Sequence, residues 1–257
     1  QDAGLKNLNY ADDDAKAVAD FLRSPQGGGF LPSDLKLLLN GEATLVAVRA
    51  ALADIARRAK SNDLIFIFIA GHGAPDPIAP QNLYFLLSDT KVVDMPNTAF
   101  PMSELKQTLD TQIAAQRVIV MIDTCHSAGV NQKTKSLVTG RDLVQEGDEN
   151  NISNFVLTSQ LFRQTGRAIL TSSDVEEVSQ ESAKWGNHGV FTWALMQGLK
   201  GAADLNGDKL ITAGELFQHT RATVQKETNF RQNPRALPGS NVNLALAFAG
   251  ATTASAK

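Results

Sequence analysis

Apolar runs alternate with amphipathic segments along this chain, and such alternation is typical of an α/β protein with a parallel sheet. A largely apolar run at residues 63–70 and an unbroken one, rich in β-branched residues, at residues 118–122 predict two buried strands. Apolar positions at three- and four-residue spacing predict helices over residues 10–22, 43–60 and 103–113. The last of these would be a right-handed crossover between the two strands, so both strands should end at the same edge of the sheet.

Shorter segments complete the expected framework. They are strands at residues 35–39, 83–87, 168–171 and 242–248 and helices at residues 189–199 and 216–224. Residues 130–167 are polar and charged with little periodicity, which predicts a linker that tolerates proteolysis. The expected organisation is a large segment over residues 1–129, this linker, a small segment over residues 168–248 and a flexible tail over residues 249–257.

The composition is that of an ordinary globular protein and argues against several classes. A chain of 257 residues can bury the core of one α/β domain or of two closely packed halves. The formal net charge of −3, without a long basic run, argues against nucleic acid as the main partner. Because no apolar run approaches the roughly 20 residues of a membrane helix and no signal-peptide pattern is present, we expect a cytoplasmic protein without membrane contact.

Two chemically reactive residues follow the buried strands. Cys125 is the only cysteine and lies just past residues 118–122, and His72 lies between two glycines just past residues 63–70. Ligands bind outside the carboxyl ends of strands in open α/β sheets. A histidine within hydrogen-bond reach of a cysteine favours the nucleophilic thiolate. Taken singly, Cys125 is equally well explained as a small buried hydrophobe and His72 is better explained as a turn histidine, but the pairing favours catalysis.

The motifs FIAGHG and DTCHSAG, which contain His72 and Cys125, resemble those of caspase-like cysteine peptidases. The second motif has the form found in metacaspases and their orthocaspase-type bacterial relatives. NYADDDAKAVADFL, AILTSSDVEEVSQES and HGVFTWALMQGLKGAAD also resemble that family, so the similarity spans most of residues 5–248. It implies a three-layer α/β fold with a mostly parallel central sheet flanked by helices. Family members have a further buried strand ahead of the segment that resembles residues 5–22, and the sequence shows no counterpart of it.

The resemblance implies a cysteine endopeptidase. Cys125 would attack the peptide carbonyl, His72 would act as its base, and the backbone N–H groups of Gly73 and Cys125 would form the oxyanion hole. His126 follows Cys125 directly and would point to the opposite side, so we assign it a structural role. Family members are cut in the linker between the large and small segments, and autocatalytic cleavage is expected there.

Two acidic residues indicate specificity. Asp123 stands two residues before Cys125 and should face the same side, where a buried carboxylate needs a cationic or hydrogen-bonding partner. By resemblance to metacaspases, Asp14 lines the same pocket, so cleavage is expected after basic residues, with Arg preferred over Lys. Capping of a turn by Asp123 and of the first helix by Asp14 stay open as alternatives. The third pocket position of the family is usually serine and is Ala70 here.

No cofactor is expected, with calcium as the open alternative. Of the acidic residues that bind calcium in many metacaspases, the chain keeps Asp89, while Thr90 and Gln132 replace two others. Residues 204–215 match an EF-hand loop at positions 1, 3, 5 and 12. Lys209 takes the place of the glycine that such a loop needs for its sharp turn, which favours a polar turn over an ion site.

Two rival interpretations come from other classes of protein. One is a caspase-like interaction module, or pseudoenzyme, controlled by a partner protein. The other is a doubly wound ligand-binding domain in which Cys125 is merely buried. The presence of both motifs favours the enzyme, whose expected partners are protein or peptide substrates with basic residues and a regulatory protein of unknown identity.

Overall fold

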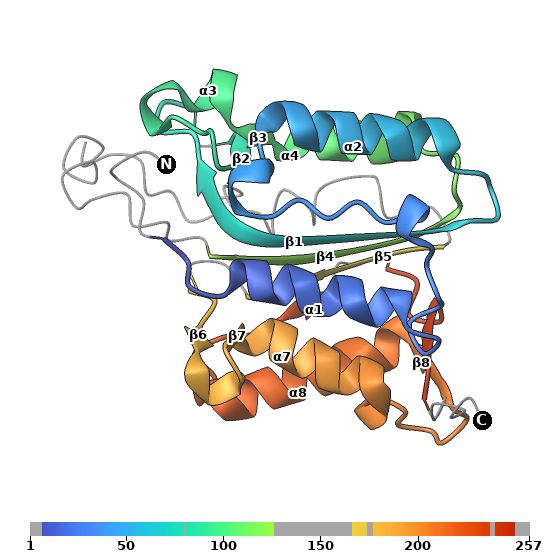
Figure 1. Cartoon of the computed structure of the whole chain (residues 1–257). Coiled ribbons are helices and arrows are strands. Elements are labelled where there is room, and N and C mark those ends of the chain that lie inside the picture. Colours follow the sequence, from blue (N-terminus) through green and yellow to red (C-terminus); the bar gives the residue numbers. More distant parts are fainter. Residues whose placement is uncertain (1–6, 80, 126–165, 174–176, 237–239, 250–257) are drawn as a thin grey trace.

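The protein has three layers, with a sheet between two sets of helices (Figure 1). The computed structural model describes residues 7–79, 81–125, 166–173, 177–236 and 240–249, and of Cys125 it describes the backbone. One face of the sheet is covered by α2 (Leu45–Arg58) and α4 (Met102–Thr111). The opposite face is covered by α1 (Ala11–Arg23), α7 (Val190–Gln197) and α8 (Ala213–Thr228). This is the predicted three-layer α/β architecture.

The main sheet has six strands in the order β3–β2–β1–β4–β5–β9. Its strands are β1 (Leu64–Pro75), β2 (Leu83–Leu86), β3 (Phe100–Pro101), β4 (Arg117–Cys125), β5 (Arg167–Thr171) and β9 (Arg235–Ala236). The three central strands β1, β4 and β5 are parallel, and the outer strands pair antiparallel. Because β4 pairs with β5, the large and small segments share one sheet.

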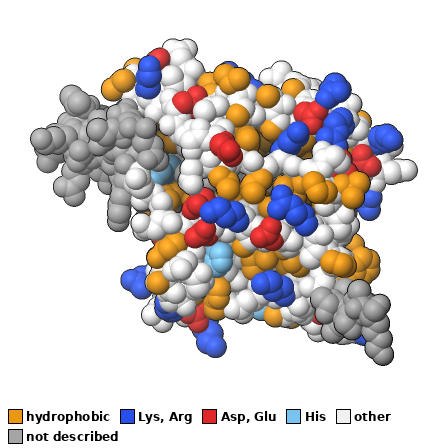
Figure 2. All heavy atoms as spheres, in the orientation of Figure 1, with side chains coloured by type: hydrophobic (Ala, Val, Ile, Leu, Met, Phe, Trp, Pro, Cys, Tyr) orange, Lys and Arg blue, Asp and Glu red, His pale blue; other side chains and the backbone are white. Residues whose placement is uncertain are grey.

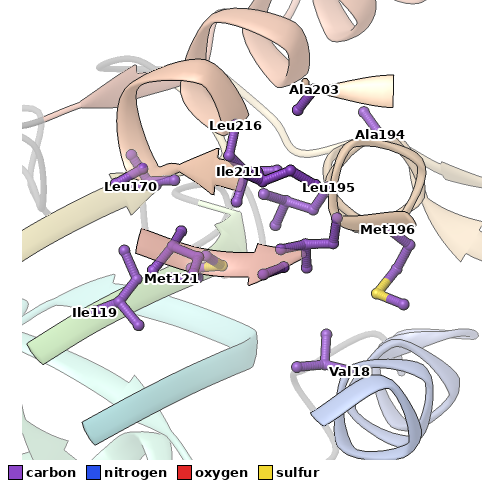
Figure 3. Close-up of a cluster of buried hydrophobic side chains, with 14 of the residues drawn as sticks. Val18, Ile119, Met121, Leu170, Ala194, Leu195, Met196, Ala203, Ile211 and Leu216 are labelled. Carbon is purple, nitrogen blue, oxygen red and sulfur yellow. The ribbon is translucent and has the colours of Figure 1, made fainter. Parts of the chain in front are cut away.

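The sequence of β4 explains why the centre of the sheet is buried on both faces. Side chains alternate between the two faces of a strand. Ile119 and Met121 are completely buried and pack in the core that contains Leu195 of α7 and Leu216 of α8 (Figure 3). The alternate positions 118, 120 and 122 belong to a second core, on the side of α2 and α4. An apolar run without alternation is therefore what this position in the fold requires.

Short elements connect these layers. They are the helical turns η1 (Pro32–Asp34), η2 (Asn40–Glu42), η3 (Val92–Asp94), α3 (Met95–Thr98), η5 (Ala183–Trp185) and η6 (Gly198–Ala202). Two small antiparallel pairs are β6 (Glu181–Ser182) with β7 (His188–Gly189), and β8 (Leu210–Thr212) with β10 (Ala245–Phe248). Among the helices that the structure describes, none has the length and apolar character to cross a membrane.

The predicted helices are confirmed, with small differences at their ends. The clearest difference is α8, which begins at Ala213 rather than at residue 216. Thr212 and Glu215 form a capping box there: each side chain accepts a hydrogen bond from the other residue's backbone N–H. Such a cap satisfies backbone donors that the first helical turn leaves free, so the helix starts at the cap rather than at its first buried residue.

The predicted strand at residues 35–39 is wrong, because this segment is extended but pairs with no described strand. On the side away from β4, the edge of β1 from Leu64 to Gly71 also has no strand partner within the described part of the chain. A largely apolar cavity of about 730 Å³ is lined by α1, α2, β1 and the extended segment. On this face hydrophobic side chains gather between the levels of α1 and α2 (Figure 2). A strand needs a hydrogen-bonded neighbour. Between residues 35–39 and that edge of β1 lies this cavity instead, so the two segments do not pair.

Strand β1 is longer than the apolar run that predicted it. It continues through Gly71, His72 and Gly73 to Pro75, because β2 pairs with it antiparallel from His72 onward. His72 is therefore part of the strand itself rather than of a turn that follows it. Figure 1 shows β1 curving away from the plane of the sheet toward its carboxyl end.

Candidate active site

His72 and Cys125 occupy paired positions on the two central strands. β1 and β4 are in parallel register from Leu64 opposite Arg117 to His72 opposite Cys125, where β4 ends. Gly73 is buried and lies one residue further along β1, opposite Phe85 of β2. The sheet thus brings the histidine and the cysteine of the two motifs to the same edge. His126 lies outside the described residues.

Asp123 is buried beside this edge, with 7% of its surface exposed, and is paired in register with Ala70. Both carboxylate oxygens accept hydrogen bonds from hydroxyl groups: Ser179 Oγ donates to Oδ1 at 2.6 Å, and Thr192 Oγ1 donates to Oδ2 at 2.8 Å. Burial raises the pKa of Asp123, and these hydroxyl groups oppose the shift. The bonded neighbours of Asp123 are thus neutral donors.

Asp14 comes from the first turn of α1, yet its side chain turns inward. Its Oδ1 atom lies 2.7 Å from His188 Nδ1, and the Gly189 N–H donates to both oxygens at 3.3 and 3.2 Å. Burial, followed by the nearby charge of Asp123, raises the pKa of Asp14 from 3.8 to about 9. By contrast Asp12 and Asp13 pair with Lys16 on the exposed side of the helix. The interpretation as ordinary first-turn acids therefore suits these two and not Asp14.

Gly189 lies between the two carboxyl groups. A methyl group on its Cα atom would lie 3.0 Å from Asp123 Oδ2 and 3.1 Å from Asp14 Oδ2. Both carboxyl groups line one cavity of about 20 Å³, to which Ala70 and Gly71 of β1 also contribute. This volume is close to that of one water molecule. The structure thus brings together Asp14, Asp123 and Ala70, the three residues that the sequence assigned to a substrate pocket.

Further polar contacts hold the walls of this cavity. The Glu181 carboxylate accepts hydrogen bonds from the backbone N–H of Asn9 and of Tyr10, which fixes the start of α1 against β6. The side chain of Gln232 is completely buried and donates to Ser172 O and to Ser179 Oγ. These bonds tie the residues around Asp123 to the rest of the small segment.

Sequence reasoning missed four residues of this site: Ser179, His188, Gly189 and Thr192. All four lie in motifs that resemble the caspase-like family, but no role was assigned to them. The one local signal is Thr192, which interrupts the apolar helix α7 and is completely buried. A buried hydroxyl in an apolar helix needs a hydrogen-bond partner, and here the partner is Asp123.

The residues considered for calcium have other partners. The Asp89 carboxylate accepts from the backbone N–H of Leu45 at 3.0 and 3.2 Å and so caps the start of α2. Thr90 Oγ1 accepts from the N–H of Leu87, and Gln132 lies outside the described residues. No group of three or more His, Cys, Asp or Glu side chains in the described part of the chain could hold a metal ion.

The loop that matches an EF-hand forms a hydrogen-bonded turn. The side chains of Asp204, Asn206 and Asp208 accept from backbone N–H groups of the loop itself. Lys209 adopts a left-handed φ of 67°, and Glu215 belongs to the capping box of α8. In this conformation the carboxylates accept hydrogen bonds that stabilise the turn and the start of helix α8.

The fold has three layers, and its central sheet pairs a histidine and a cysteine at the end of two neighbouring strands. This is the architecture of a caspase-like peptidase. The caspase domain model, peptidase family C14, matches residues 2–240, and the chain belongs to this family. The chain is also 21% identical over 132 residues to Metacaspase-7 of Arabidopsis thaliana. This match covers 49% of the chain and 33% of that relative, so the chain spans only part of the relative's length.

A solved structure supports the fold independently. Protein GSU0716 from Geobacter sulfurreducens superposes with a TM-score of 0.60 at 17% sequence identity. The superposition covers 95% of this chain and 91% of that protein. At this level of identity the likeness concerns the arrangement of helices and strands.

Proposed function

We propose that the chain is a cysteine endopeptidase that cleaves peptide bonds after basic residues, with Arg preferred over Lys. The observation that carries the proposal is the pair of buried carboxyl groups, Asp14 and Asp123, which line one cavity, with Asp123 two residues before Cys125 on β4. Buried carboxylates without a cationic partner are costly, and the bonded neighbours of Asp123 are neutral hydroxyls. Among the described residues no Lys or Arg side chain forms an ion pair with Asp14 or Asp123, and a substrate cation would supply that partner.

The catalytic part of the proposal rests on the register of β1 and β4. Residues paired in register lie on the same face of a sheet, which favours a dyad of Cys125 as nucleophile and His72 as base. The thiolate attacks the carbonyl carbon, the acyl-enzyme forms, the amine leaves with a proton from His72, and water hydrolyses the thioester. The backbone N–H groups of Gly73 and Cys125 would stabilise the oxyanion.

The preference for arginine follows from the shape of the cation. Its planar guanidinium can donate to a carboxylate through two parallel bonds, while lysine presents one compact charge. The cavity lined by Asp14 and Asp123 is where we expect this cation to bind.

Autocatalytic cleavage in the linker is part of the proposal. The candidate sites follow Lys133, Lys135, Arg141 and Arg163, which lie outside the described residues. Arg167 is a poor site, because it begins β5, pairs with β4 and is buried with 4% of its surface exposed. The linker therefore ends one residue earlier than the sequence suggested.

A peptide-library cleavage profile tests the function. Purified wild type should cleave peptides with Arg or Lys before the scissile bond and should leave matched Asp peptides intact, while Cys125→Ala should cleave none. Comparable turnover of Asp and Arg peptides would contradict the specificity. Mass spectrometry of the same two proteins tests autoprocessing: a cut after a basic linker residue should occur in wild type, and Cys125→Ala should stay whole.

A further inference from the structure

We propose that His188 is a positioning residue for specificity, which holds the Asp14 carboxyl group in the pocket and shares with it one proton that leaves when a cationic side chain binds. The proposal deepens the function given above and rests on it, since it concerns the pocket of the same site. His188 and Asp14 are 174 residues apart in sequence, on β7 and α1.

The contact has the geometry of a directed hydrogen bond. Asp14 Oδ1 lies 2.7 Å from His188 Nδ1, with 5% of the Asp14 side chain and 24% of the His188 side chain exposed. The Gly189 N–H holds the same carboxyl group from the adjoining residue. Asp14 is thus fixed from β7, while its Oδ2 atom faces the cavity beside Gly189 and Asp123. Without the imidazole, the carboxyl group would be free to rotate out of this position.

The charges around the pair favour one retained proton. Within the described part of the chain, the carboxylates that act on Asp14 or on His188 are Asp13 on α1, Asp123 on β4 and Glu181 on β6, and the cation that acts on His188 is Lys200 on η6. Burial raises the pKa of Asp14 to about 9 and lowers the pKa of His188 below its ordinary 6.5. In the free pocket the Asp14 carboxyl group therefore stays protonated and donates a hydrogen bond to the neutral Nδ1 atom of His188.

Entry of a substrate guanidinium changes this balance. The ionised carboxylate is the better partner for a cation, so Asp14 releases its proton to solvent and accepts hydrogen bonds from the substrate instead. The O–H bond and its hydrogen bond to His188 Nδ1 are the ones that break, and the Gly189 N–H remains bonded to the ionised carboxylate. Binding of an arginine side chain should then become tighter as the pH rises toward the pKa of Asp14, while binding of an uncharged isostere should not.

The kinetic test compares His188→Ala with His188→Asn, whose side-chain oxygen can replace Nδ1 as acceptor. Substrates are a fluorogenic peptide ending in Arg and its citrulline counterpart, which has the same shape without the charge. In His188→Ala, KM for the Arg peptide should rise about tenfold with kcat within about twofold of wild type, because the Asp14 carboxyl group is no longer held facing the cavity. His188→Asn should recover most of the loss. His219→Asn, which changes a half-buried histidine of α8, should match wild type.

The pH profile of the Arg-to-citrulline ratio of kcat/KM separates positioning from a general structural effect. In wild type the ratio should rise between pH 7 and 9. In His188→Ala its midpoint should move down by about one pH unit, because the protonated form of Asp14 has lost its acceptor. An unchanged KM and an unchanged profile in His188→Ala, in an enzyme that cleaves Arg peptides, would overturn the role of His188 and leave the proposed function standing.

Calorimetry with Nα-acetyl-argininamide on the Cys125→Ala background makes the test independent of turnover. In buffers of different ionisation heat, binding near pH 7 should release about one proton, and the additional change His188→Ala should reduce this release. Binding without proton release overturns the inference even if peptides are cleaved. If the wild type does not hydrolyse any of the peptides and Cys125→Ala does not bind Nα-acetyl-argininamide, both the proposed function and the inference are wrong.

Discussion

His72 of β1 and Cys125 of β4 are directly opposite each other in a parallel register that runs without interruption for the length of β4. Val118 to Ile122 of β4 are buried, so its register cannot slip without moving an entire set of core side chains to the other face. The core thus fixes which residues of β1 and β4 lie opposite each other.

This register predicts that either residue is indispensable for hydrolysis. Cys125→Ala and His72→Ala should each lower kcat on an Arg peptide by at least about a thousandfold, because nucleophile and base act as one unit. Circular dichroism and thermal melting should show that both variants keep the fold. Labelling of Cys125 by a thiol-reactive peptide probe should also disappear in His72→Ala, and retained labelling would contradict the role of His72 as base.

Asp123 should determine the charge preference. Losing one partner of a buried charge pair costs about 2–5 kcal/mol, so Asp123→Ala should lower kcat/KM on an Arg peptide by tens- to thousands-fold. The citrulline peptide should be much less affected. Asp12→Ala is the matched control, because it removes a carboxylate from the exposed side of α1, the helix that carries Asp14. It should leave kcat/KM unchanged for both the Arg and the citrulline peptide.

Gly189→Ala tests the close approach of the two carboxyl groups. Its methyl group would lie 3.0 Å from Asp123 Oδ2 and 3.1 Å from Asp14 Oδ2, which is tighter than ordinary contact, so the carboxyl groups have to move apart. We expect a loss of at least about tenfold in kcat/KM for the Arg peptide. Gly41→Ala is the control, because a methyl group there meets nothing within 4 Å. Equal activity of the two variants would exclude a pocket at Gly189.

Asp14 should make the protein less stable as the pH rises. Its folded-state pKa is about 9 against an ordinary 3.8, so the folded state holds an extra proton between these values. The contribution is fully present below about pH 4 and is lost as the pH rises toward 9. Asp14→Asn has no such titration, and its free energy of unfolding relative to wild type should increase by about 5 kcal/mol between pH 5 and pH 9, because the folded wild type holds close to one extra proton over most of this interval. Urea unfolding at both pH values measures the difference, and a constant difference would contradict it.

Calcium should be dispensable. Asp89 already caps α2, and Asp204 and Asp208 bind backbone N–H groups, so an ion would have to break these bonds. Addition of EDTA or of excess calcium should change neither peptide hydrolysis nor the melting temperature. A calcium-dependent rise in activity that Asp204→Asn abolishes would contradict this expectation.

Much of the fold could be predicted because its signals are local. An apolar run such as residues 118–122 can be buried only at the centre of a sheet covered by helices on both faces. The segment 35–39 has a similar local pattern and was therefore predicted as a strand. Whether an extended segment pairs depends on its neighbour in space, and a cavity beside β1 occupies that position.

The sequence alone indicated the candidate dyad, since the chain has one cysteine and the apolar runs at residues 63–70 and 118–122 lead directly to the histidine and cysteine motifs. It also determined that Asp123 would be buried near Cys125, because the period of a strand is two residues. The resemblance to metacaspases placed Asp14 in the pocket of Asp123, but only the tertiary structure showed that Gly189 lies between the two carboxyl groups and that His188 contacts Asp14. Those contacts join α1, β4 and β7 across most of the chain, and no local spacing encodes the distance between side chains that the packing of separate layers brings together.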